Sequence, residues 1–119
     1  LLYYHSCAHE NATNCSFYKR HHDYIPSDNL KNQGVRIMTC FIYLNDVTAG
    51  GYTIFDNISV KPKKGRAILW PNVLSSHPND MDDRTHHEAK PVLQGEKYAA
   101  NFWLHQYDFR EAHTRGCTH

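Results

Sequence analysis

Short runs of apolar residues at close spacing dominate the pattern of this chain. The longest, residues 35–44 (Val-Arg-Ile-Met-Thr-Cys-Phe-Ile-Tyr-Leu), is rich in β-branched and aromatic side chains and predicts a strand. Turn-forming residues separate it from its neighbours, as at residues 26–34, Asn45-Asp46 and Gly50-Gly51. No segment predicts a helix convincingly. Further strands are predicted at residues 1–5, 17–24, 52–55, 58–61, 66–70, 86–93 and 97–105.

Many short strands joined by turn-rich links predict an all-β sandwich or barrel. A double-stranded β-helix, or jelly roll, fits best because it gathers inward-facing residues of distant strands around one opening. The 119 residues form a single domain, 1–119, with one core. Within it, residues 1–16 form a variable N-terminal strand and loop, and residues 108–119 a loose polar tail.

Composition narrows the class of partner. The net charge of +1 produces no strong field toward nucleic acid or anionic lipid, so we expect no nucleic-acid partner. No apolar run approaches the ~20 residues that span a bilayer, so we expect no membrane span in this chain.

The four cysteines form no Cys-x-x-Cys motif, so a structural zinc site is not expected. Cys40 lies in an apolar run and predicts a buried free thiol. Cys7 and Cys15 flank a polar loop that a disulfide could close, and Cys117 lies near the end of the chain.

Glycosylation sequons start at Asn11, Asn14 and Asn57. Together with the possible disulfide, they favour an oxidising compartment, the endoplasmic reticulum or secretory pathway.

Candidate chemistry centres on a His-x-Asp pair, His21 and Asp23. Residues i and i+2 of a strand face the same side, so both side chains would lie together and His22 would point away. A third candidate lies in the run Arg84-Thr-His-His-Glu88, where the pattern alone leaves His86 and His87 as alternatives and the carboxylate of Glu88 as a further candidate. Two imidazoles and one carboxylate form the facial triad of non-haem Fe(II) oxygenases. The other interpretation of the His-x-Asp pair is a polar strand end.

The predicted strand 97–105 has two contrasting faces. One carries Lys97, Asn101, Trp103 and His105, and the other is apolar. A buried lysine needs an anion, and no Asp or Glu of this strand is placed to supply one. A bound dicarboxylate would serve, whereas a lysine that extends to solvent at the strand end is the alternative.

Two further polar groups could contact such a ligand. Tyr43 shares a face of strand 35–44 with Thr39 and Phe41, where its phenol could bind a carboxylate or simply a backbone group. Thr53 follows the Gly50-Gly51 turn, where a hydroxyl is often structural only.

Together these runs resemble the prolyl 4-hydroxylase family of 2-oxoglutarate- and Fe(II)-dependent dioxygenases. The resemblance covers about residues 17–109 in the family's order and spacing. The matching runs are Tyr18-Lys-Arg-His21-His-Asp23-Tyr24, Arg36-Ile-Met-Thr-Cys-Phe-Ile-Tyr43, Gly50-Gly-Tyr-Thr53, Pro62-Lys-Lys-Gly65, Arg84-Thr-His-His87, Pro91-Val-Leu-Gln-Gly-Glu-Lys97 and Asn101-Phe-Trp103-Leu-His105.

The resemblance implies a role for each matching position. It implies His21, Asp23 and His87 as metal ligands and catalytic centre, and Lys97 as the anchor for the far carboxylate of 2-oxoglutarate. Further co-substrate contacts fall on Tyr43 and Thr53, and residues near the peptide on Tyr18, Arg36, Trp103 and His105. Another co-substrate contact falls where the loop 6–16 lies, and Tyr3 or Tyr4 could supply it. The helices that precede this core in the family are expected to be absent from this chain.

The implied reaction is hydroxylation of peptidyl proline in a proline-containing peptide or protein, with oxidative decarboxylation of 2-oxoglutarate to succinate and CO2. It implies Fe(II), O2 and 2-oxoglutarate, with ascorbate as reductant. One alternative is the same chemistry on another peptide side chain. Another is a non-enzymatic jelly-roll binding module with a degenerate site, against which the intact ligand set and Lys97 argue.

Overall fold

A computed structural model describes residues 1–9, 13, 15–108 and 110–116. Short strands make up most of the regular structure in this part of the chain. They are β1 (Leu2–His5), β2 (Tyr18–His21), β3 (Arg36–Tyr43), β4 (Ala49–Gly50), β5 (Thr53–Ile54), β6 (Ser59–Val60), β7 (Ala67–Pro71), β8 (His87–Ala89), β9 (Val92–Gln94) and β10 (Glu96–His105).

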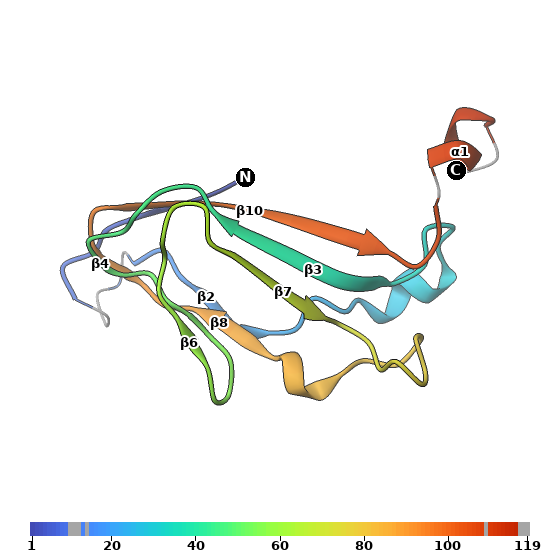
Figure 1. The fold of residues 1–119 in the computed structure, drawn as a ribbon, viewed down its shortest axis with the longest axis horizontal. Helices are drawn as coiled ribbons and strands as arrows, with labels where there is room; N and C mark the ends of the chain where they lie inside the picture. Colours follow the sequence, from blue (N-terminus) through green and yellow to red (C-terminus); the bar gives the residue numbers. More distant parts are fainter. Residues whose placement is uncertain (10–12, 14, 109, 117–119) are drawn as a thin grey trace.

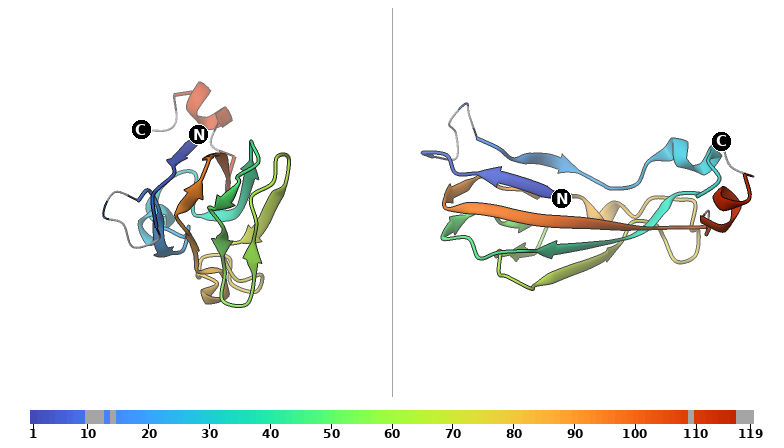
Figure 2. Two further views of the ribbon diagram at one scale, coloured as in Figure 1. Left: turned by 90° about the vertical axis from the view of Figure 1, so that its left-hand side faces the viewer. Right: turned by 90° about the horizontal axis from the view of Figure 1, so that it is seen from above.

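The strands form two main antiparallel sheets that lie one over the other (Figure 1). One has the order β1-β10-β3-β7, and its strands run side by side when seen from above (Figure 2, right). The other has the order β2-β8-β5-β6, and the pair β4-β9 closes one end. Neighbours in these sheets are mostly far apart in sequence, as in a jelly roll, and the predicted all-β class is confirmed.

Strand β3 supplies the centre of the core. Its alternation buries Thr39, Phe41 and Tyr43 and leaves Cys40 and Ile42 half-buried on the outer face. Phe41 and Tyr43 pack with Trp70 of β7, which lies beside β3 in the same sheet. This cluster forms the floor on which the site is built.

Strand β10 turns its polar face inward. Lys97 and Ala99 are fully buried, whereas Tyr98, Phe102 and Leu104 on the apolar face are 37%, 54% and 50% exposed. A burial pattern read from hydrophobicity alone would reverse these two faces. The inward position of the polar face indicates an interior that is itself polar.

Three predicted segments differ from the structure. The single strand expected over residues 86–93 is two strands, β8 and β9, because Pro91 has no N–H to continue a ladder. Residues 26–34, expected as a turn, contain a 3-10 helix, η1 (Pro26–Leu30). The tail, expected to be loose, contains a short helix, α1 (Arg110–Thr114), at the end of the molecule opposite β4 (Figure 1).

The disulfide that the sequence left as a possibility joins Cys7 and Cys15, with the two Cα atoms 5.2 Å apart. Cys40 is free, but it is half-buried rather than buried because it lies on the outer face of β3. Asn57 of the third sequon is exposed in the turn between β5 and β6. Cys117 and the sequon residues Asn11 and Asn14 lie outside the described residues.

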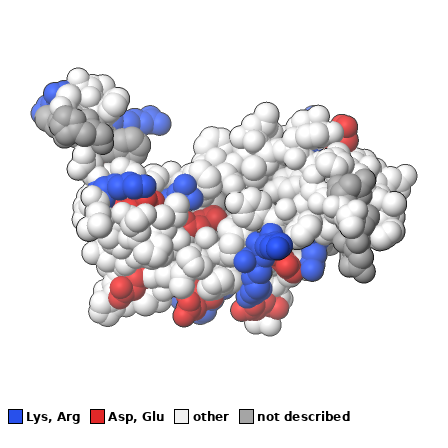
Figure 3. Space-filling view, turned by 180° about the vertical axis from the view of Figure 1, so that it is seen from behind, with Lys and Arg blue, Asp and Glu red and all other residues white. Residues whose placement is uncertain are grey.

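Charges of both signs are interspersed on the face shown in Figure 3. Among the described helices, none has the length and apolar character needed to cross a bilayer.

Candidate functional site

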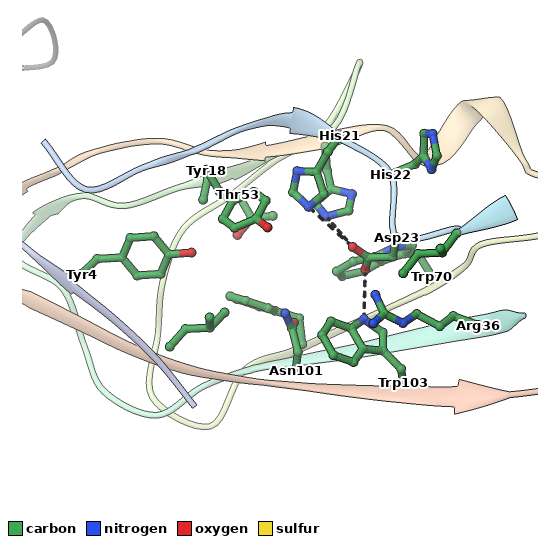
Figure 4. Close-up of a pocket in the computed structure, with 15 residues that line it drawn as sticks. Tyr4, Tyr18, His21, His22, Asp23, Arg36, Thr53, Trp70, Asn101 and Trp103 are labelled. Carbon is green, nitrogen blue, oxygen red and sulfur yellow. Dashed lines mark hydrogen bonds and ion pairs between the residues drawn. The ribbon is translucent and has the colours of Figure 1, made fainter. Parts of the chain in front are cut away.

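A cavity of about 460 Å³ lies between the two main sheets. It extends from Tyr4 of β1 at one end to Arg36 of β3 at the other, with His21 and Thr53 on one side and Asn101 on the opposite side (Figure 4). Its volume lies in the range that holds a small ligand.

Three of the residues singled out in the sequence meet at this cavity. His21 ends β2 and lies opposite His87 in the β2–β8 pairing, and Asp23 follows two positions later. The Nε2 atoms of His21 and His87 lie 3.5 and 3.7 Å from Oδ1 of Asp23. One ligand atom from each residue falls within 4.8 Å of the others. The two strands therefore bring a carboxylate and two imidazoles to one point.

The tautomers of both imidazoles suit a metal. Nδ1 of His21 lies 2.7 Å from the carbonyl of Lys19, and Nδ1 of His87 lies 2.9 Å from the carbonyl of Thr85. A carbonyl only accepts, so Nδ1 carries the proton in each ring and Nε2 keeps its lone pair. Burial lowers the pKa of His87, which favours the neutral ring that a metal requires.

The carboxylate of Asp23 is 6% exposed and is held by its other oxygen. Thr39 donates to Oδ2 at 2.7 Å, and the indole of Trp103 points at the same atom at 3.4 Å. Burial opposes ionisation, but the imidazole of His21 beside the carboxylate and the hydrogen bond from Thr39 bring the pKa of Asp23 below its ordinary value. Oδ1 is left facing the two Nε2 atoms.

The neighbouring histidines take no part in this cluster. His22 points away from His21 and Asp23 (Figure 4), and its ring packs edge-on against His86 at 4.9 Å. Nδ1 of His86 lies 2.8 Å from the carbonyl of Asp83. Of the two residues that the sequence left open, His87 therefore faces the cavity.

Lys97 is fully buried, and no described carboxylate pairs with it. Its Nζ donates to the carbonyl of Gly51 at 2.8 Å and lies 4.8 Å from the ring centre of Tyr4. Burial lowers its pKa to about 8. A buried ammonium with one carbonyl partner still has two N–H groups to satisfy, as an anionic ligand would do.

The Gly50-Gly51 turn positions the groups around Lys97. Both glycines have positive φ, 77° and 73°, and a Cβ on Gly50 would lie 2.5 Å from the carbonyl of Pro91. The turn leads into Thr53, which is 3% exposed and lines the cavity. Tyr43 lies behind it and donates to Thr53 Oγ1 at 2.6 Å, with the carbonyl of Val60 3.3 Å from the same phenol oxygen.

The choice between Tyr3 and Tyr4 depends on pairing that the sequence does not reveal. Tyr4 pairs with Lys97 in the β1–β10 register, is 6% exposed and lines the cavity. Tyr3 points outward and donates to Glu96. Sequence reasoning also gave no role to Trp70, whose ring centre lies 4.7 Å from that of His87.

The four residues expected near a peptide separate into two groups. Tyr18, Arg36 and Trp103 line the cavity, and the guanidinium of Arg36 stacks 3.7 Å from the ring centre of Trp103. His105 is not among the cavity-lining residues, and its Nδ1 lies 3.0 Å from the carbonyl of Gly34. Tyr18 and Trp103 are 53% and 39% exposed, so the cavity opens to solvent at both residues, of which Tyr18 lies toward the Tyr4 end and Trp103 beside Arg36 (Figure 4).

The fold and the donor set define a class. Two imidazole nitrogens and a carboxylate oxygen that converge inside a jelly roll form a facial triad, the ligand set of mononuclear non-haem iron oxygenases. The chain belongs to the 2OG-Fe(II) oxygenase superfamily, whose sequence model matches residues 7–105.

Individual relatives agree with this assignment. Prolyl 4-hydroxylase subunit alpha-1 of Homo sapiens is 45% identical over 89 residues, covering 71% of this chain and 16% of that subunit. Subunit alpha-2 of Gallus gallus is 42% identical over 94 residues, covering 75% and 17%. This chain therefore spans about a sixth of the length of these relatives.

A solved structure shares the fold. The viral collagen prolyl hydroxylase of Paramecium Bursaria Chlorella virus-1, in complex with 2OG, superposes with a TM-score of 0.72 at 27% identity. The match covers 89% of this chain and 56% of the viral chain.

Proposed function

We propose that this chain is the catalytic core of a 2-oxoglutarate- and Fe(II)-dependent dioxygenase that hydroxylates peptidyl proline. The observation that carries the proposal is the convergence of His21, Asp23 and His87 in a cavity beside a buried lysine without a carboxylate partner among the described residues. Relatives named as prolyl 4-hydroxylases support the proline substrate.

The donor set fits Fe(II). His21 and His87 would each bind through Nε2 and Asp23 through Oδ1, leaving the positions on the opposite side open. When bound, Fe(II) would supply the chemistry that couples O2 and 2-oxoglutarate to hydroxylation, with succinate and CO2 as the other products. The protein's own contribution is to orient the three ligands and to exclude water around His87, which packs against Trp70 and Phe55.

The co-substrate would lie toward the Tyr4 end of the cavity. Lys97 would pair with its far carboxylate, with Thr53 and the phenol of Tyr4 as hydrogen-bond donors. Tyr43 would act through Thr53, because its hydroxyl already donates to that residue. The ammonium of Lys97 and the far carboxylate of 2-oxoglutarate would then form an ion pair that is shielded from solvent.

The peptide would lie over the solvent-exposed part of the cavity lining. Tyr18 and Trp103 offer exposed aromatic faces to a proline ring, and Arg36 offers donors to peptide carbonyls. His105 would contact the part of the peptide that reaches the end of β10. Ascorbate is proposed as the reductant that returns the metal to Fe(II).

The test is incubation of the purified chain with Fe(II), ascorbate, 2-oxoglutarate and a set of proline-rich peptides, followed by mass spectrometry. We expect a gain of one oxygen atom on proline, with succinate formed in equal amount. Oxidation confined to another side chain would favour the first alternative. Tight binding of Fe(II) and 2-oxoglutarate without any product would favour a binding module.

The affinity for 2-oxoglutarate should depend on pH through Lys97. Its pKa in the free protein is about 8, so the ammonium is present below that pH and is lost above it. We expect a constant Kd below pH 8 and a Kd that rises by about tenfold per pH unit above it, because binding must then take up a proton. Anaerobic titration of the Fe(II) protein with 2-oxoglutarate between pH 6.5 and about 9.5 measures this, and a flat profile would place the carboxylate elsewhere.

A further inference from the structure

Behind the carboxylate of Asp23 lies a buried chain of hydrogen bonds. Thr39 is fully buried on β3 and donates to Oδ2 of Asp23 at 2.7 Å. Asn72, which follows β7 and is 1% exposed, donates from Nδ2 to Oγ1 of Thr39 at 2.9 Å. Neither residue is among those that line the cavity.

The chemistry of the three groups fixes the direction of this chain. An ionised carboxylate only accepts, so the single hydroxyl proton of Thr39 must point to Asp23. The oxygen of Thr39 must then accept from its other neighbour, and only the amide NH2 of Asn72 can donate. A reversed amide would place two acceptors in contact.

A second branch runs from Asn72 to His87. The backbone carbonyl of Asn72 accepts from the amide of Asp82 at 3.0 Å. The carbonyl of Asp82 accepts from the hydroxyl of Thr85 at 2.9 Å, and the carbonyl of Thr85 lies 2.9 Å from Nδ1 of His87. Asn72 is thus connected to one candidate ligand through its side chain and to another through its backbone.

We propose that Thr39 and Asn72 are positioning residues for the metal centre, an inference that rests on the proposed function. By holding Oδ2, Thr39 turns Oδ1 alone toward the two imidazoles and makes Asp23 a one-oxygen ligand. Asn72 fixes the direction in which the Thr39 hydroxyl donates. It also links the orientation of the Asp23 carboxylate to that of the His87 ring.

The polar character of the buried Thr39 and Asn72 supports a role beyond packing. If apolar residues of similar volume replaced Thr39 and Asn72, Oδ2 of the buried Asp23 would keep only the 3.4 Å contact to Trp103. Oδ1 of Asn72 is itself buried with no hydrogen-bond partner among the described residues. The amide of Asn72 therefore leaves its own Oδ1 unpaired while its Nδ2 donates to Thr39.

The experiment compares Thr39→Val, Thr39→Ser and Asn72→Leu with the unaltered chain. Fe(II) is titrated anaerobically into each, and the absorption band that forms with 2-oxoglutarate is recorded. We expect Thr39→Val to bind Fe(II) about 10- to 100-fold more weakly and to shift the band, as for other residues that orient metal ligands. Thr39→Ser should restore both, and Asn72→Leu should weaken binding in the same direction but less.

Thermal unfolding without metal separates this role from a structural one. Thr39→Val that unfolds like the unaltered chain and binds Fe(II) equally well, with the same band, would overturn the inference and leave the proposed function intact. Failure of the unaltered chain to bind Fe(II) would overturn both. If Thr39→Val does not fold, Asn72→Leu decides by the same measurements.

Discussion

Replacement of His87 by alanine is expected to abolish Fe(II)-dependent turnover of 2-oxoglutarate. The imidazole is 6% exposed and supplies one of the three ligand atoms that lie within 4.8 Å of one another. Its loss leaves two protein ligands, and Fe(II) affinity should fall by more than about 100-fold, beyond the effect of removing an outer hydrogen bond. Anaerobic Fe(II) titration and succinate release measure the two effects.

The neighbouring histidine provides a matched control. His86 differs from His87 by one position, but its ring packs against His22 and its Nδ1 meets the carbonyl of Asp83. His86→Ala should therefore retain Fe(II) binding and turnover. If His86→Ala lost both while His87→Ala retained them, the ligand set would have to be reassigned.

Replacement of Lys97 by methionine is expected to raise the 2-oxoglutarate concentration needed for half-maximal turnover by about 100- to 1000-fold. Methionine keeps much of the volume of the buried side chain but not its charge, so the carboxylate would enter a closed site unpaired. Fe(II) affinity should change little, because Lys97 is not in the metal cluster. The pH dependence of 2-oxoglutarate binding should disappear in the same variant.

Lys90→Met is the control for the loss of a lysine. Lys90 pairs with Glu88 at 2.9 Å, but its side chain is 42% exposed, and such pairs contribute about 0–1 kcal/mol. We expect an unchanged requirement for 2-oxoglutarate. Without ligand, Lys97→Met should be at least as stable as the unaltered chain, because no ammonium is buried. A marked loss of stability would indicate that Lys97 serves the fold rather than a co-substrate.

The inward-facing residues of β3 and β10 could be predicted from the sequence, because side chains of a strand alternate between its two faces. The period of two along β3 and β10 places Thr39, Phe41 and Tyr43 on one inner face and Lys97 on another, as observed. The same alternation fails for Arg36, which it groups with the outward Cys40. The register shifts between Leu104 and His105, so Arg36 turns into the cavity and stacks on Trp103.

Other features depend on long-range pairing and could not be predicted. Tyr3 and Tyr4 differ only in which one lies inward, and the register of β1 against β10 decides it. Asn72 lies in a polar run after β7 that has the pattern of an ordinary loop, and its proposed role depends on three segments that meet behind Asp23.

The break between β8 and β9, by contrast, was predictable, because Pro91 is visible in the sequence.

The bond between Cys7 and Cys15 has a practical consequence for handling this protein. It links the segment that follows β1, the strand with Tyr4, to the segment that precedes β2, the strand with His21. Thiol additives such as dithiothreitol, commonly used to protect iron enzymes, would reduce this disulfide. Purification buffers that keep iron reduced with a non-thiol agent are therefore the appropriate choice.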